Sequence, residues 1–218
     1  YVPRRQYQAT DIGNGERLRD RHGDKIRWVA GWQRWLVWDG RRWATDTDGS
    51  MVMQLAKDVV RSELWPEAVQ AIASGARGAK AVLAWAKRSG GTQALRGMMF
   101  CAQSEDGILA QHTDLDRDPW LLNVQNGTVD LRAGTLGPHD PKDLITKVAG
   151  CAFDIELSGG RAQAGAFGEW SRFVRDAMDG DAYLEAYLQK AAGYSLTGDV
   201  REEKLFFLYG YGRNGKST

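Results

Sequence analysis

Apolar residues recur with two different periods along this chain, and each period predicts a different kind of element. In the stretch from residue 26 to 49, "IRWVAGWQRWLVWDGRRWATDTDG", an alternation typical of half-buried strands is visible in "WLVWDGRRW" at 35–43. Asp39-Gly40 within this stretch is a dipeptide typical of type I′ hairpin turns. We therefore predict a small antiparallel meander, which holds five of the nine tryptophans: Trp28, Trp32, Trp35, Trp38 and Trp43.

A short helix is predicted just before this meander, in "DIGNGERLRDRHGDK". Asp11 or Asn14 is the expected N-cap, because short polar side chains accept hydrogen bonds from the free amides of a first helical turn. Ile12 and Leu18 are the expected apolar anchors of this helix against the rest of the fold.

Helical spacing returns after the meander and continues to residue 104. Apolar side chains repeat there every three to four positions, which is the period of one helix face. Gly75, Gly78 and the pair Gly90-Gly91 are expected to separate one helix from the next. The expected helical stretch begins at residues 51–65, is continued by 67–74 and 78–88 with a break at Gly75 and Gly78, and is followed by a last helix at 92–104. The packing residues are Val52, Leu55, Val59, Leu64, Val82, Leu83, Trp85, Leu95, Met98, Met99 and Phe100.

From residue 120 on, apolar residues again recur at every second position, which is the period of a strand. "WLLNVQNGTVDL", from Trp120, predicts a β-hairpin with Asn126-Gly127 at its turn. "LITKV" at 144–148 and "CAFDI" at 151–155 are predicted to be further short strands.

A change of composition then marks a boundary. Residues 158–165, "SGGRAQAG", have the composition of a flexible linker. Two amphipathic helices are predicted after it, at about 166–178 and 181–194. "KLFFLYG" follows from Lys204, and such a continuous apolar run is typical of a strand in the buried centre of an α/β sheet.

Composition narrows the class of protein only a little. The 218 residues are 43% hydrophobic and 26% charged with a net charge of +1, which is ordinary for a globular protein. Residues 1–43 nevertheless carry ten Lys or Arg against five Asp or Glu, so either a solvated basic face or a phosphate-rich partner remains open there. Cys101 and Cys151 lack ligand spacing, which favours a reducing cytoplasmic setting over a disulfide or zinc scaffold. No apolar run reaches membrane-spanning length, so no membrane partner is expected.

One motif carries chemistry. Residues 210–217 follow the pattern G-x-x-x-x-G-K-S behind the apolar run, as in a phosphate-binding loop. Gly210, Gly212 and Gly215 would let backbone N–H groups converge on phosphate oxygens, Lys216 would supply charge to the outer phosphates, and the Ser217 hydroxyl would hold Mg²⁺. The motif thus predicts binding of ATP and Mg²⁺, against the alternative of a glycine-rich turn beside an exposed lysine.

Several strings in their order along the chain resemble one family. They are "GNGERLRDRHGDKIRWVAGWQRWLVWDGRRW", "DLDRDPWLLNVQNGTVDL", "HDPKDLITKVAGCAFD" and "YLQKAAGYSLTGDVREEKLFFLYGYGRNGKST". Together they are similar to the primase–helicases of phages, plasmids and large DNA viruses, whose motor is a superfamily 3 helicase. The resemblance implies a hexameric, ATP-driven 3′→5′ DNA helicase that opens a replication origin or fork.

The same resemblance assigns roles to the residues of the loop. Lys216 would be the catalytic contact to the β- and γ-phosphates, Ser217 the magnesium ligand, and Asn214 a residue that shapes the loop. The family's acidic pair, sensor asparagine and arginine finger would follow Thr218, so the chain alone is not expected to hydrolyse ATP efficiently. The nucleotide-binding set is Gly210, Gly212, Arg213, Asn214, Gly215, Lys216, Ser217 and Thr218.

The expected organisation has an α+β module followed by the beginning of a motor. The module, with its Trp-rich meander, helices and β-hairpin, is assigned to residues 1–157 and the linker to 158–165. A helical collar is assigned to 166–203. Residues 204–218 would be the first strand and phosphate loop of a P-loop α/β domain of the AAA+ type, and any primase domain would precede Tyr1.

The basic meander has two interpretations. It could be a stacking platform for single-stranded DNA, formed by Arg27, Arg34, Arg41, Arg42 and Trp35. The favoured alternative is that the tryptophans fill one face of a small sheet while the arginines solvate the other, because packing is the commoner fate of aromatic residues.

Two rival functions therefore accompany the helicase hypothesis. The chain could be a non-catalytic module for single-stranded DNA binding and oligomerisation, which would bind DNA without ATP in a salt-sensitive way. It could also belong to an unrelated P-loop ATPase, for example a regulatory or packaging one.

The remaining polar candidates are interpreted as structural. His22, His112 and His139 are scattered among polar residues and are expected at the surface or in turns. Alternating carboxylates at Asp114, Asp116 and Asp118 could hold a metal ion. The glycine and the glutamate of an EF-hand loop are missing, so these three residues are expected to cap helices and turns.

Overall fold

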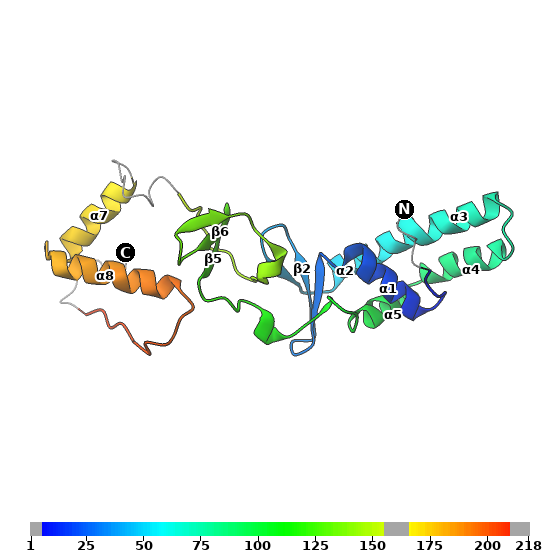
Figure 1. Cartoon of the computed structure of the whole chain (residues 1–218), viewed down its shortest axis with the longest axis horizontal. Coiled ribbons are helices and arrows are strands. Elements are labelled where there is room, and N and C mark those ends of the chain that lie inside the picture. The colour runs from blue at the N-terminus through cyan, green and yellow to red at the C-terminus, as the bar shows by residue number, and fades with distance from the viewer. Residues whose placement is uncertain (1–5, 155–165, 210–218) are drawn as a thin grey trace. The chain divides into compact units, whose positions relative to one another are not determined.

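The computed structural model describes residues 6–154 and 166–209 (Figure 1). The chain has an α+β fold of helices and two small sheets, as predicted. It forms two compact units. The first comprises the residues up to Leu115 together with Pro141–Lys147, and the second comprises Asp116–Asp140 and the residues from Val148 on.

The predicted meander forms the sheet of the first unit. Strands β1 (Ile26–Val29), β2 (Arg34–Trp38) and β3 (Trp43–Asp46) are antiparallel, and the short β4 (Leu109–Ala110) joins β1 in parallel, giving the order β3-β2-β1-β4. The sequence pattern did not indicate β4, because two residues show no period.

The turn between β2 and β3 differs from the predicted two-residue turn. Trp38 pairs with Trp43, so the connection is residues 39–42, and only Gly40 among them has a positive φ, of 97°. The Asp39 carboxylate accepts hydrogen bonds from the amides of Arg41 and Arg42 at 2.8 and 2.9 Å. A type I′ turn needs two consecutive residues with positive φ, and the side chain of Asp39 stabilises a wider loop instead.

The described part of the first unit also contains five α-helices and three short helical turns, and the breaks after the third and fourth α-helices fall where glycines predict them. Gly75 and Gly78 both have positive φ, at 64° and 92°, between two of the helices. The helices are α1 (Asp11–His22), α2 (Ser50–Val59), α3 (Trp65–Ala73), α4 (Ala79–Ser89) and α5 (Thr92–Ala102), with the π-helical turn η1 (Val60–Leu64) and a 3₁₀ turn, η2 (His112–Asp114).

The π-helical turn joins α2 to α3 in one continuous run. Pro66, in the first turn of α3, has no N–H to donate, and its ring would clash with the carbonyl one α-turn earlier. A local π-turn relieves that conflict without ending the helix. The helical stretch expected at 51–65 does continue through 67–74, and the structure adds a π-bulge between the two parts.

Helix α1 begins one residue earlier than its predicted caps suggest. The Thr10 hydroxyl accepts the amide of Gly13 at 3.1 Å and is the N-cap, whereas Asp11 lies inside the first turn. Asn14 is fully buried and donates to the hydroxyl of Ser89 at 3.0 Å. Leu18 is buried as expected, but Ile12 is 63% exposed, so its role as an anchor was predicted wrongly.

Nine of the eleven expected packing residues of the later helices are buried or partly buried. Val52, Val59 and Met98 have no exposed surface. Val82 and Phe100 are 36% and 73% exposed, so their packing roles were predicted wrongly. The helix period identifies an apolar face, but the neighbours that cover this face come from other parts of the chain.

The sheet of the first unit is buried on both faces. Trp35 and Val37 belong to the main core with residues of α1, α2 and α5. Leu36 and Trp43 lie on the opposite face, in a second cluster that Leu144 helps to close. The expectation that tryptophans fill only one face is therefore wrong, because strand alternation and register send Trp35 and Trp43 to opposite sides.

A buried carboxylate connects this sheet to the helices. Asp46 ends β3, and its carboxylate accepts the amides of Met51 and Val52 at 3.3 and 2.9 Å, so it caps α2. We expect Asp46→Ala to lower the free energy of unfolding by about 1–2 kcal/mol, because two helix amides lose their partner. Urea unfolding measures the loss. The matched control is Asp48→Ala, which removes an exposed acceptor for one α2 amide, that of Ser50. An equal loss in both variants would contradict the larger contribution expected of the buried carboxylate of Asp46.

The sheet of the second unit contains the predicted hairpin and one further strand. Its antiparallel strands are β5 (Leu121–Val124), β6 (Gly127–Asp130) and β7 (Thr135–Gly137), in that order. Val124 pairs with Gly127, so Gln125 and Asn126 form the turn and Gly127 lies within the strand. A Cβ added at Gly127 would be 2.2 Å from the carbonyl oxygen of Gly137, so this position has no room for a side chain.

Two segments predicted as strands are not strands. Residues 144–148 follow a 3₁₀ turn, η3 (Pro141–Asp143), and make isolated bonds, such as the one from the amide of Trp43 to the Ile145 carbonyl at 2.8 Å. Residues 151–154 are likewise held by single contacts, including two of 2.9 Å between the Asn126 side chain and the backbone of Phe153. Isolated hydrogen bonds therefore hold residues 144–148 and 151–154 in place, but neither segment adds a strand to a sheet.

The two amphipathic helices predicted after the linker are present as α7 (Ala166–Ala177) and α8 (Ala182–Leu196). Asp181 caps α8 by accepting the amides of Tyr183 and Leu184 at 2.8 and 3.2 Å. Apolar side chains on both helices, such as Trp170 and Tyr187, are more than half exposed. The predicted linker at 158–165 lies outside the described residues.

Candidate functional site

The residues of the predicted phosphate loop, from Gly210 to Thr218, lie outside the described residues. The stretch just before them is described, and Lys204–Tyr209 does not form a strand. Leu205 and Phe207 are more than four-fifths exposed, and only Phe206 lies near other aromatic rings, those of Tyr187 and Tyr194. A central strand needs a neighbour on each side, and no strand within the described ranges pairs with this segment.

The tryptophans that were expected in the basic meander differ in exposure, and Trp32, between β1 and β2, is 46% exposed. Trp35 is 5% exposed and packs edge-to-face on Trp28 with ring centroids 5.2 Å apart, so its face cannot stack on a base. The guanidinium of Arg27 lies 4.5 Å from the ring centroid of Trp43 and donates to the carbonyls of Ile26 and Gly23. Burial lowers the pKa of Arg27 from its usual value.

The other arginines of the meander lie closer to solvent and also bind the chain itself. Arg34 donates to the carbonyl of Thr47 at 2.8 Å, and Arg42 donates to the carbonyl of Thr146 at 3.2 Å. Arg41 is exposed. These positions favour packing and loop anchoring as the main role of the meander.

The arginines of α1 are all paired with carboxylates. Arg17 donates two hydrogen bonds to Glu67 at 2.8 and 2.9 Å and one to Glu63 at 3.1 Å. Arg19 pairs with Asp20, and Arg21 with Asp58 at 2.6 Å. Burial alone would lower the pKa of Arg17, but hydrogen bonds and charges from the two glutamates outweigh it and raise this pKa.

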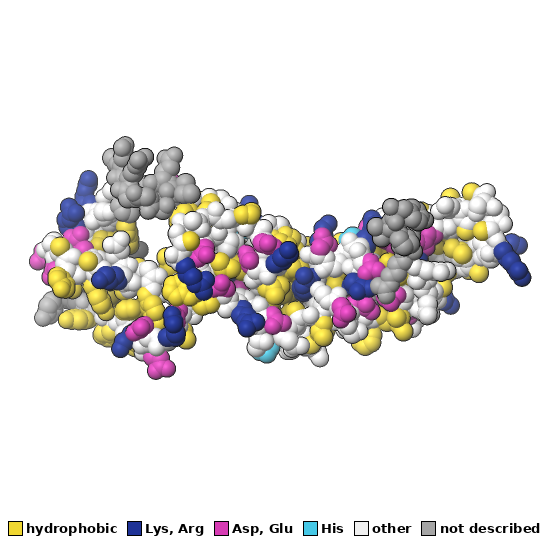
Figure 2. Space-filling view, in the orientation of Figure 1, with side chains coloured by type: hydrophobic (Ala, Val, Ile, Leu, Met, Phe, Trp, Pro, Cys, Tyr) yellow, Lys and Arg dark blue, Asp and Glu magenta, His cyan; other side chains and the backbone are white. Residues whose placement is uncertain are grey.

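A different surface carries basic side chains without such partners. From residue 68 to 104 the chain has no Asp or Glu and five basic residues, all exposed. Within the described residues, none of these five is in an ion pair. Figure 2 shows the Lys and Arg side chains at the α3–α4 end of the first unit, with no acidic side chain around them on this face. The residues are Arg77, Lys80, Lys87, Arg88 and Arg96.

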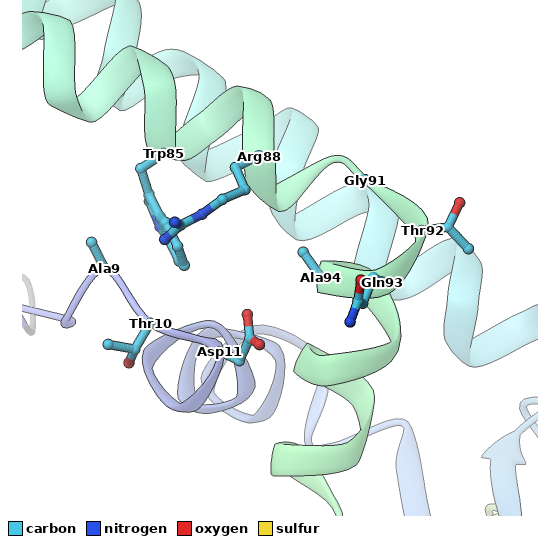
Figure 3. A pocket seen from close by; sticks show the side chains of 9 residues that line it. All are labelled: Ala9, Thr10, Asp11, Trp85, Arg88, Gly91, Thr92, Gln93 and Ala94. Carbon is cyan, nitrogen blue, oxygen red and sulfur yellow. The ribbon is translucent and has the colours of Figure 1, made fainter.

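An open hollow of about 570 Å³ lies beside this surface (Figure 3). Trp85 and Arg88 form one wall, and the guanidinium of Arg88 is 4.5 Å from the ring centroid of Trp85. Asp11 from α1 and Gln93 from α5 face them from the other side. Two apolar or uncharged segments complete the lining: Ala9 and Thr10 before α1, and Gly91, Thr92 and Ala94 at the start of α5.

Sequence reasoning missed this site for two different reasons. The acid-free run at 68–104 is visible in the sequence, but it lies outside the basic segment 1–43 that drew attention as a candidate interface. The hollow is not visible, because it joins residues 9–11 to residues 85–94 through the packing of α1 on α5. That packing depends on Gly15, where an added Cβ would be 2.8 Å from the Cβ of Cys101.

The histidine and carboxylate candidates serve structure. His22 is buried, not at the surface as predicted, and its Nε2 lies 2.9 Å from the carboxylate of Asp58. His139 contacts the Asn123 side chain at 2.8 Å. Asp114 accepts the amide of Gln111, and Asp118 accepts that of Trp120, as expected of capping residues.

Two negative findings apply to the described residues. No group of three or more His, Cys, Asp or Glu in residues 6–154 and 166–209 could hold a metal ion. Over the same residues, no helix combines the length and the apolar character needed to cross a membrane.

Asp58 gives the first unit a predictable response to acid. Hydrogen bonds from Arg21 and Ser62 are the main causes that lower the pKa of Asp58 from 3.8 to about 2. Because the folded pKa is depressed, this stabilisation is present above pH 4 and is lost as the pH falls towards 2. The free energy of unfolding, measured with urea, should fall between pH 6 and pH 3, and we expect Asp58→Asn to make this fall smaller. The reduction should be no more than about 1 kcal/mol, since the Asp58–Arg21 pair is partly exposed. An unchanged fall would contradict this role of the Asp58 carboxylate.

The fold and its surface define an α+β protein with a basic helical face. The comparison with known families identifies the family to which the chain belongs. A family model described as D5 N-terminal-like matches residues 15–179. The match covers well over half of the 218 residues, so the chain belongs to the D5 N-terminal-like family, a region of phage and plasmid primase–helicases. A search of curated proteins finds no match to the chain.

Proposed function

We propose that this chain is the part of an ATP-dependent replicative DNA helicase that precedes and begins its motor. The family match supports a DNA replication protein of the primase–helicase type. The observation that carries the finer proposal is the order of features: the family region at 15–179 is followed by an apolar run and then by G-x-x-x-x-G-K-S at 210–217. That order is expected where a D5-type region meets a P-loop motor.

The residue types of the loop fit magnesium-bound ATP. Glycines at 210, 212 and 215 allow backbone N–H groups to approach phosphate oxygens, and Lys216 adds a positive charge. The hydroxyl of Ser217 is a hard oxygen ligand of the kind that Mg²⁺ prefers. Bound Mg²⁺ would neutralise charge on the outer phosphates during phosphoryl transfer. The tasks of these side chains are to bind and orient the nucleotide.

The proposal extends to partners. A replicative motor acts on single-stranded or forked DNA, and motors of this family are expected to act as hexamers. The exposed apolar side chains of α7 and α8, such as Trp170 and Tyr187, are compatible with a collar that packs on other parts of the assembly. These partners remain part of the proposal.

DNA-stimulated ATP hydrolysis tests this function. The protein encoded by the whole reading frame is expected to hydrolyse ATP faster when single-stranded DNA is added, and removal of Mg²⁺ with a chelator should stop hydrolysis. Hydrolysis that is indifferent to DNA would favour an unrelated P-loop ATPase. Absence of hydrolysis with DNA binding retained would favour the non-catalytic binding module instead.

A further inference from the structure

We propose that the surface formed by α4 and the start of α5 binds single-stranded DNA. Phosphates lie along Lys80 and Lys87, and one base lies in the hollow against Arg88. The choice of DNA as the bound polyanion rests on the proposed function. The charge and the shape of the surface are properties of the structure and do not depend on that function.

The first argument is the uncompensated charge. Lys80 and Lys87 are seven residues apart on α4, so they share one helix face and lie about 10 Å apart along its axis. Arg77 precedes them in the loop after α3, and no carboxylate occurs between residues 68 and 104. Basic side chains on α1 are neutralised by Glu63, Glu67 and Asp58, so the charge on α4 stands out from its surroundings. A row of unneutralised cations is the electrostatic feature that attracts a phosphate backbone.

The second argument concerns a flat stacking surface beside this row. The guanidinium of Arg88 covers the ring of Trp85 at 4.5 Å, and both groups form one wall of the hollow (Figure 3). Unpaired bases stack on aromatic rings and on guanidinium planes. Because Trp85 is partly buried and packed against the core, it holds the guanidinium in place. Arg88 therefore presents a flat, positively charged face to the open space.

The third argument fixes the orientation of the nucleotide. Asp11 lines the hollow opposite Arg88, and its carboxylate would repel a phosphate placed there. The phosphates must then lie outside the hollow, over Lys80 and Lys87, and the hollow takes the base. A carboxylate can accept a hydrogen bond from an exocyclic amino group, and the amide of Gln93 offers both a donor and an acceptor. A base inside a duplex is stacked and paired and cannot enter, so the site selects single strands.

Fluorescence anisotropy with a labelled single-stranded oligonucleotide of mixed sequence tests the proposal in the whole chain without ATP. Three exposed charges are removed in Arg77→Gln/Lys80→Gln/Lys87→Gln. We expect the dissociation constant at 50 mM salt to rise about tenfold or more, and the slope of log K against log salt to fall by about 2, near 0.7 for each lost phosphate contact. The matched variant Arg34→Gln/Arg41→Gln/Arg42→Gln removes three charges from the meander and is expected to change the constant by less than about threefold.

The conservative variant Arg88→Lys separates stacking from charge. It keeps the positive charge but loses the guanidinium plane, so it should weaken single-strand binding about fivefold and reduce the preference for single strands over duplex. Circular dichroism and urea unfolding establish that each variant is folded. Equal weakening of duplex and single-strand binding by Arg88→Lys would overturn the base site.

Two further outcomes would overturn the proposal as a whole. One is absence of binding at low salt, and the other is a larger loss from the meander variant than from the α4 variant. The binding test is made without ATP and changes no residue of the phosphate loop, so its outcome is independent of nucleotide binding. Failure of ATP hydrolysis in the whole protein would therefore contradict the proposed function but not the binding surface on α4. Loss of the proposed DNA binding with ATP hydrolysis retained would contradict the surface alone.

Discussion

Lys216→Ala is expected to abolish ATP-driven strand separation by the whole protein while leaving its fold intact. The lysine of a phosphate loop places a positive charge on the outer phosphates, where negative charge is redistributed during transfer. Loss of one such electrostatic contact lowers kcat by about 10²–10³ in enzymes where it has been isolated. We expect ATP hydrolysis to fall by at least this factor, and nucleotide binding to weaken as well.

Steady-state hydrolysis with and without single-stranded DNA measures this effect. Lys204→Ala is the matched control, because Lys204 is an exposed lysine a few residues before the loop. It should hydrolyse ATP at close to the unchanged rate. If Lys216→Ala and Lys204→Ala behaved alike, the loop would be a glycine-rich turn and not a nucleotide site.

The second large effect concerns the stability of the first unit. Arg17 has a side chain that is 9% exposed, forks onto Glu67, reaches Glu63 and lies 4.4 Å above the ring centroid of Tyr7. Arg17→Met would keep the apolar stem, leave Glu67 without its cation and leave Glu63 with the longer contact to Arg21 at 3.7 Å. Removal of one partner of a buried ion pair costs about 3–5 kcal/mol. Because the glutamates retain some contact with water, we expect Arg17→Met to lower the free energy of unfolding by about 3 kcal/mol, the lower end of this range.

Urea unfolding compares Arg17→Met with Arg21→Met. Arg21 lies one turn further along the same helix and contacts Asp58 and Glu63, but about a third of its side chain is exposed. Its replacement should therefore lower the free energy of unfolding by about 1 kcal/mol or less. Similar losses in the two variants would show that burial of the Arg17 network contributes nothing beyond a surface pair. A restored midpoint in the combined variant Arg17→Met/Glu67→Met would support the interpretation that the unpaired charge causes the loss.

Local patterns were sufficient to predict most elements of the fold. Alternation and helix spacing located the meander, the helices on both sides of it and the hairpin, and glycines such as Gly75 and Gly78 located the breaks. Strand β7 was missed because its three residues, Thr135–Gly137, show no alternation. The opposite error occurred at 144–148, where apolar residues suggested a strand but the backbone makes only isolated bonds. A strand exists only where a partner strand is available, and sequence period does not report partners.

The exposure of single side chains was harder to predict than the elements. Ile12 and Phe100 lie on helices that were correctly expected, yet both are exposed. Trp35 and Trp43 were both expected on one face of the meander, and the register puts them on opposite faces. In each case the outcome depends on which distant segment covers the position, such as the loop at 141–147 that covers Trp43.

The candidate sites divide in the same way. The phosphate loop is a local motif, so its residues could be named from the sequence, and their roles remain predictions because they lie outside the described residues. The surface on α4 has a local part, the acid-free run of basic residues. Its hollow is non-local, since Asp11 and Arg88 meet only through tertiary packing. The absence of Asp and Glu from residues 68–104 indicates the first part, and no local pattern indicates the second.

Strand separation on a forked DNA substrate tests the central claim most directly. The protein from the whole reading frame is incubated with a fork that carries one labelled strand, with magnesium and ATP or a non-hydrolysable analogue. We predict release of the labelled strand with ATP only, and no release by Lys216→Ala. Protein that is folded and hydrolyses ATP but releases no strand from any forked or tailed substrate would contradict the assignment as a replicative helicase.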